Sequence, residues 1–102
     1  MAITNSPVSN SGAANIYASS GNSVVVTTYI CNTTGSAISA NLYLVPSAGT
    51  ASSSNQIISS LVIAGNDTYI MNNERVVLAN GDMLQAEANA SGLTATISYT
   101  GV

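Results

Sequence analysis

Very few side chains in this chain could take part in acid–base chemistry. Its charged groups are four carboxylates and one guanidinium, and four of the five lie within the short stretch Ala64–Leu84. They are Asp67, Glu74, Arg75, Asp82 and, just beyond that stretch, Glu87. Two carboxylates that converge on a cleft can hydrolyse a glycosidic bond. The first question is therefore whether the sequence places any two of these groups together.

The local pattern gives each carboxylate its own structural position instead. Asp67 lies between two strand patterns, where an Asx side chain accepts hydrogen bonds from turn N–H groups. Asp82 directly follows an Asn-Gly pair, a common place in a hairpin. Glu74 and Arg75 are neighbours in a predicted strand, so their side chains point to opposite faces, and Arg75 is expected to reach a carboxylate on an adjacent strand. We expect no catalytic pair and no enzyme activity.

Metal, cofactor and nucleophile sites are not supported by the sequence either. The chain has no histidine and one cysteine, Cys31, so a single chain cannot assemble a zinc site or a Cys-His nucleophile. It has no acidic loop with EF-hand spacing and no glycine-rich phosphate loop. Cys31 is expected to be a small buried thiol on a strand. We therefore predict no metal and no cofactor.

The composition excludes further classes of function. Only 5% of the 102 residues are charged, against roughly 25% in a typical soluble protein, while 46% are hydrophobic. With one arginine, no lysine and a net charge of −3, the chain cannot neutralise nucleic-acid phosphates or an anionic membrane. The N-terminal residues lack the pattern of a signal peptide, so synthesis in a cytoplasm is expected. A surface of Ser, Thr and Asn is poorly protected against association, which suits a protein that assembles.

Period-two alternation runs along most of the chain and predicts strands separated by Gly-, Asn- and Ser-rich turns. The predicted strands cover residues 14–18, 23–32, 38–46, 56–63, 67–72, 74–79, 82–90 and 93–100. This pattern predicts an all-β antiparallel β-sandwich of jelly-roll or Greek-key type, with seven to eight short strands. Residues 14–102 are expected to form this single domain. Residues 1–13 are small and polar and are expected to form a flexible N-terminal arm.

The alternation also predicts which side chains share a face. In residues 23–32, Val24, Val26, Thr28 and Ile30 are predicted on one face and Val25, Thr27, Tyr29 and Cys31 on the other. In residues 82–90, the predicted inward set is Leu84, Ala86, Ala88 and Ala90, and in residues 93–100 it is Leu93, Ala95, Ile97 and Tyr99. Asn80-Gly81 is predicted to form a type I′ hairpin turn, and Ser91-Gly92 a second tight turn.

Five tyrosines are the only aromatic residues. Most are expected to fill the rim of the core, but tyrosine is also favoured where a contact is both apolar and wet. Tyr29 and Tyr43 are the candidates for interface anchors, because their neighbours on the same strand face are polar or mixed. Arg75 is the third interface candidate.

The order of several short motifs resembles that of small β-sandwich virion proteins of tailed bacteriophages, including phages of cyanobacteria. The motifs are an Ile-Tyr strand (residues 16–17), a "CNTT" turn (31–34), a "LYLVPSAG" strand and loop (42–49), "NDT" (66–68), "LANGD" (78–82) and a closing "ATIS" strand (95–98). They span about residues 15–101.

The resemblance implies a structural role in a virion and no enzymatic one. It is compatible with a capsid decoration, or cement, protein that bridges major capsid subunits as an oligomer, expected to be a homotrimer on the capsid exterior. The alternative is a tail, neck or fibre component of the same fold; the decoration role is favoured, because a short, self-contained domain suits a protein present in many copies. A carbohydrate-binding module of jelly-roll type is a third interpretation, although the chain lacks tryptophan and histidine. The expected partners are further copies of the chain and the major capsid protein or other virion proteins.

Overall fold

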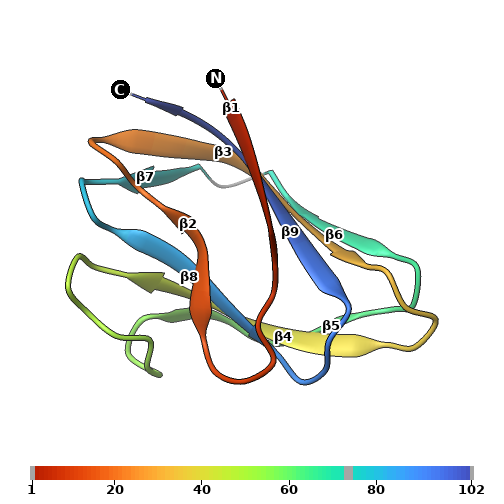
Figure 1. The fold of residues 1–102 in the computed structure, drawn as a ribbon. Helices are drawn as coiled ribbons and strands as arrows, with labels where there is room; N and C mark the ends of the chain where they lie inside the picture. The colour runs from red at the N-terminus through yellow and green to blue at the C-terminus, as the bar shows by residue number, and fades with distance from the viewer. Residues whose placement is uncertain (1, 73–74, 102) are drawn as a thin grey trace.

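The computed structural model describes residues 2–72 and 75–101, which form two antiparallel sheets packed face to face (Figure 1). The described part of the chain contains no helix of the length and apolarity that a membrane crossing needs. The nine strands are β1 (Ala2–Pro7), β2 (Ala14–Ala18), β3 (Ser23–Asn32), β4 (Ile38–Val45), β5 (Gln56–Ile63), β6 (Thr68–Met71), β7 (Val76–Leu78), β8 (Met83–Ala88) and β9 (Leu93–Gly101). The predicted all-β sandwich is confirmed.

The strands are wound as a jelly roll. The first sheet has the order β1-β9-β3-β6 with β7 also paired to β3, and the second has the order β2-β8-β4-β5. β6 pairs with Thr28–Cys31 and β7 with Ser23–Val25, so the two lie end to end along β3 as one interrupted strand. If β6 and β7 are counted as one strand, the first strand pairs with the last and the second pairs with the last but one. The innermost pair is the β4–β5 hairpin. This is one long hairpin wrapped over two sheets.

The strand count is nine rather than seven to eight, and the additional strand is β1. It lies in the segment predicted to be a flexible arm, yet Ala2–Pro7 pairs with β9 along its whole length. Val8, directly after it, is 4% exposed and belongs to the core. The residue pattern contains little sign of β1, because an edge strand has one backbone partner and this one buries little side-chain surface.

Pro7 is compatible with β1 because of the side of the strand to which its nitrogen points. The Val8 N–H donates to the carbonyl oxygen of Leu93 at 2.9 Å. Hydrogen-bonded residues alternate along an antiparallel strand, so the nitrogen of Pro7, which carries no hydrogen, points to the free edge. The backbone groups of Ile3 and Asn5 point to the same free edge.

The faces predicted for β8 and β9 are confirmed within the strands. Leu84, Ala86 and Ala88 are buried on β8, and Leu93, Ala95 and Ile97 are buried on β9, with Tyr99 partly buried against the same core. Ala90 was predicted to point inward but is exposed, because β8 ends at Ala88.

The face predicted for β3 is wrong over its first half. The pairing of β3 with β9 shifts register between Val25 and Thr27. A bulge of this kind reverses the inward and outward alternation beyond it. Val25 therefore shares the buried face with Thr28 and Ile30, whereas Val24 faces outward.

The two predicted tight turns carry the chain from one sheet to the other. β7 pairs with β3 in the first sheet and β8 lies in the second sheet, so Asn80-Gly81 does not close a hairpin. In this turn the Asp82 N–H donates to Ala79 O at 3.1 Å, and only Gly81 has a positive φ, of 88°. A type I′ turn would require a positive φ at both central residues. Ser91-Gly92 likewise links β8 to β9, in different sheets.

Candidate functional site

The described carboxylates are dispersed over the molecule. Asp67 is exposed in the turn before β6, where its carboxylate accepts a hydrogen bond from the Thr68 N–H at 2.8 Å. Glu87 is half-buried on the outer face of the second sheet, beside Asn41. Glu74 lies outside the described residues. Over residues 2–72 and 75–101 no three acidic or cysteine side chains gather in a way that could hold a metal ion.

Asp82 has a structural role. Its carboxylate accepts hydrogen bonds from the backbone N–H groups of Ser47 and Ala79, both at 3.0 Å. It therefore ties the turn after β7 to the loop after β4. The prediction that this carboxylate supports a turn agrees with these contacts, although the turn joins two sheets.

The two tyrosines proposed as interface anchors lie in different surroundings. Tyr29 is 39% exposed on the outer face of the first sheet, whereas Tyr43 is only 8% exposed on the second sheet. Tyr43 is flanked in the sheet by Gln85 on β8 and Gln56 on β5. With so little of its side chain exposed, Tyr43 offers little surface to a partner in this structure.

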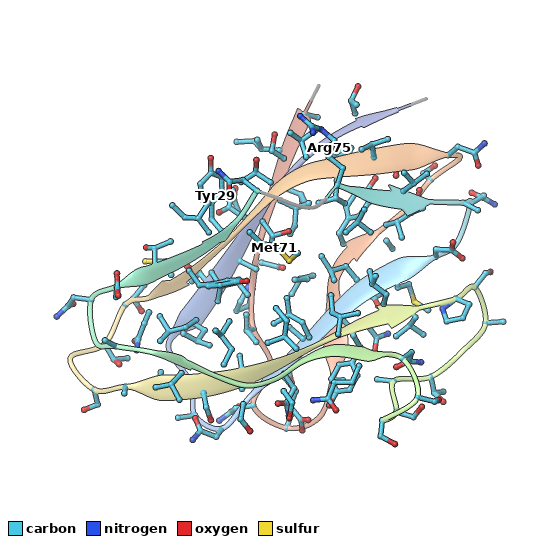
Figure 2. All side chains as sticks on the ribbon, turned by 180° about the vertical axis from the view of Figure 1, so that it is seen from behind. Tyr29, Met71 and Arg75 are labelled. Atoms are coloured by element: carbon cyan, nitrogen blue, oxygen red, sulfur yellow. The ribbon has the colours of Figure 1, made fainter. Side chains whose placement is uncertain are left out.

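Arg75 is exposed and lies directly before β7. Figure 2 shows it on the same outer side of the first sheet as Tyr29, while Met71 lies between the two sheets. Tyr29 and Arg75, two of the three candidates, thus belong to one side of the molecule. Tyr43 lies on the opposite sheet.

The outer face of the first sheet, here called the β1-β9-β3-β6 face, exposes an unusual share of large apolar side chains. Of the six large hydrophobic residues that are clearly exposed in the described chain, Tyr29 and three others lie on strands of this sheet. Their exposed fractions are 66% for Ile3, 39% for Tyr29, 50% for Ile70 and 71% for Val77. Tyr29 and Ile70 are direct neighbours in the sheet, whereas Ile3 and Val77 lie apart from them on β1 and β7. Exposed apolar surface on one face is a feature of interaction sites.

The register of the strands brings two of these side chains, Tyr29 and Ile70, into one row. Asn5 pairs with Thr96, Thr96 with Tyr29, and Tyr29 with Ile70, so the row crosses β1, β9, β3 and β6. The Asn5 Nδ2 group donates to Thr96 Oγ1 at 2.7 Å, which fixes the polar end of the row. The result is a flat strip that is polar at one edge of the sheet and apolar at the other.

Hydroxyl groups and one thiol also lie on the β1-β9-β3-β6 face. Every second residue of β9 points outward, and these residues are Thr94, Thr96, Ser98 and Thr100. Cys31 lies between Thr94 on β9 and Thr68 on β6, and it is a partly exposed free thiol rather than the buried one expected. Each described carboxylate lies elsewhere, at the turns or on the second sheet.

The outer face of the second sheet has a different character. Val45 is 2% exposed although it faces outward beside Met83, because the loop of residues 46–55 folds back over it. A Cβ placed on Gly49 in that loop would lie 3.4 Å from Val45 Cγ1. The face carries Glu87 and exposes Val62 at its β5 edge.

An apolar groove lies on the side where β5 of the second sheet borders β6 and β7 of the first. Its volume is about 410 Å³, and Ile57, Met71 and Val77 are among its lining residues, with Arg75 also lining it. The groove is open to solvent and contains one charged side chain. Its described lining can admit an apolar side chain of a partner protein.

Sequence reasoning missed Ile3 and Ile70 as candidates. Each is a single apolar residue in a polar or mixed stretch, and such residues are common on surfaces. They gain significance only because the strand register places them on the same face as Tyr29.

Comparison of the chain with protein-family models, with curated proteins and with solved structures found no match.

Proposed function

We propose that this protein is a structural component of a tailed-phage virion, and specifically a capsid decoration, or cement, protein. In this proposal it assembles on the outside of the shell as an oligomer, expected to be a homotrimer, and bridges neighbouring major capsid subunits. The protein is made in the host cytoplasm and acts through contacts with other proteins. The observation that carries the proposal is the flat, largely uncharged β1-β9-β3-β6 face, which exposes Tyr29 and Ile70.

The proposed mechanism is stabilisation by multivalent contact. Each copy in an oligomer that binds one capsid subunit holds the next copy near a second subunit, so the later contacts form at a high effective concentration. Weak individual contacts then resist separation of the shell. A small jelly roll with few charged groups suits this role, since its contacts depend little on salt.

A tail, neck or fibre component remains the alternative function. The same exposed face would serve assembly there, and the sequence resemblance covers both locations. A carbohydrate-binding module is the third candidate. Tyr29, with its partly exposed ring, is the side chain on the β1-β9-β3-β6 face against which a sugar could stack.

The test is addition of the purified protein to phage particles that lack it, followed by electron microscopy with a label on the protein. The decoration role predicts saturable density distributed over the shell and a higher temperature for release of the packaged DNA. Density confined to the vertex or tail would support the alternative. If the protein did not bind particles but bound immobilised glycans, the decoration and tail roles would both be wrong and the carbohydrate-binding function would be supported.

A further inference from the structure

We infer that the β1-β9-β3-β6 face is the surface through which copies of this chain meet around a common symmetry axis. The inference rests on the self-association contained in the proposed function, and it names the interface that carries it. The occupant of the face is a second copy of the same chain.

Charge is the first argument for a copy as the occupant. Around a symmetry axis a side chain comes close to its own equivalents in the other copies, so a charge placed there repels itself. The chain has a net charge of −3, and its described carboxylates lie away from this face: Asp67 and Asp82 in turns, and Glu87 on the second sheet. Arg75, exposed directly before β7, lies on the same outer side of this sheet. Copies of an acidic protein can thus approach through the β1-β9-β3-β6 face without repulsion between the described carboxylates.

The area of the face is the second argument. Four strands about 4.8 Å apart give a width of roughly 19 Å, and the nine residues of β9 at about 3.3 Å each give a length of roughly 30 Å. The flat area is therefore about 570 Å², before the relief of the side chains is included. A standard interface takes about 800 Å² of accessible surface from each partner. Because β1 and β6 are shorter than β9, the face supplies at most about 570 Å² of flat area, which is the larger part of one partner's share.

The chemistry of the face is the third argument. Tyr29 lies near its centre beside Ile70, and tyrosine is enriched at interfaces, whereas lysine and acidic residues are depleted. The surrounding threonine and serine hydroxyls can each donate and accept hydrogen bonds, so they can pair with equivalent groups on another copy. The other sheet is less suited, because the loop of residues 46–55 covers part of it and Glu87 lies on it.

A pair of matched variants tests the inference. Ile70→Lys places a positive charge on the β1-β9-β3-β6 face, and Val62→Lys makes the same kind of change on β5, at the edge of the second sheet. Both residues are exposed aliphatic side chains on edge strands, at 50% and 66%. Circular dichroism and thermal unfolding first establish that both variants fold. Size-exclusion chromatography with light scattering then gives the molar mass over a range of concentrations.

The inference predicts an oligomeric wild type, an Ile70→Lys variant whose dissociation constant is raised at least about 100-fold, and a Val62→Lys variant that associates as the wild type does. The reactivity of the Cys31 thiol, on the same face, is an independent measure of whether the interface is covered. Its alkylation by iodoacetamide should be at least about tenfold slower in the assembled wild type than in the dissociated Ile70→Lys variant.

The outcomes separate this inference from the proposed function. An oligomer that Ile70→Lys leaves intact, with Cys31 equally reactive in both proteins, would overturn the inference. A wild type that is monomeric at all concentrations would also overturn it, even if the monomer bound the shell. Dissociation by Ile70→Lys alone supports the interface, whether or not the protein binds particles. Loss of shell binding by the wild type would contradict only the decoration role.

Discussion

Replacement of Asn32 by aspartate should destabilise this domain more than any other change of similar size. Asn32 ends β3 and is 0% exposed. Its Nδ2 group donates to the carbonyl oxygens of Ser36 at 2.8 Å and Ile63 at 2.9 Å. Its Oδ1 atom accepts from the N–H of Thr34 at 2.9 Å and from the Thr34 hydroxyl at 2.7 Å. All four hydrogen bonds that the amide can make are therefore formed, and they join β3, the loop after it and the end of β5.

The expected loss follows from these contacts. Aspartate has the same shape but no donor. The buried Ile63 carbonyl oxygen would lose its side-chain partner, the Ser36 carbonyl oxygen would keep only the Thr34 hydroxyl at 3.0 Å, and both would face a buried carboxylate. A buried group left unsatisfied costs about 1–3 kcal/mol, and a charged one costs more. Asn32→Asp should therefore lower the free energy of unfolding by about 4 kcal/mol. That is a large part of the roughly 5–15 kcal/mol available to a domain, and it corresponds to a fall in Tm of about 16–32 °C.

The assay is urea unfolding followed by tyrosine fluorescence and circular dichroism at one fixed protein concentration, because association would add to the measured stability. Asn22→Asp is the matched control, since Asn22 is exposed and the same change there should alter stability by less than about 0.5 kcal/mol. A loss at Asn32 no greater than that of the control would refute the hydrogen-bonding argument.

Three further predictions concern the same scaffold. Thr28→Val should stabilise the domain by about 1 kcal/mol in urea unfolding, because the Thr28 hydroxyl is buried without a hydrogen-bond partner among the described residues; a destabilised variant would contradict this. Gly65→Ala should lower Tm by at least about 10 °C, since the new Cβ would clash with backbone atoms of Gly35 and Ser36. Gly35→Ala should change Tm little, because no atom lies near the position of its new Cβ. An equal fall in Tm in both variants would contradict the clash. Asp82→Ala should cost about 1–2 kcal/mol by losing two hydrogen bonds from backbone N–H groups, and an unchanged denaturation midpoint would show that these bonds contribute nothing.

The sequence was informative where one face of a strand is buried and the other is not. In β8 and β9 the alternation of Leu84 and Ala86, or of Ala95 and Ile97, matches burial directly, because successive side chains point to opposite faces. The bounds of β3 and β5 also agree with the predicted ranges, since turn-forming residues flank both. The absence of histidine and the scarcity of charge are properties of the composition, and from them we expect no enzyme activity.

Other features were decided by contacts between segments far apart in the chain. The bulge in β3 reverses its faces, and its position is set by pairing with β9. Asn80-Gly81 has the local sequence of a hairpin turn, but β7 pairs with β3, so the chain crosses to the other sheet. Tyr43 and Tyr29 both sit in strands of mixed polarity. Their neighbours across the sheets leave one nearly buried and the other exposed.

By itself, the sequence determined the sandwich class, most of the strands and the poverty of reactive groups, because these depend on residue type and on a period of two along the chain. The tertiary structure alone decided that β1 joins the sheet and that Ile3, Tyr29 and Ile70 share a face. Strand register depends on pairing between residues as distant as Asn5 and Thr96, and local periodicity contains no information about such partners.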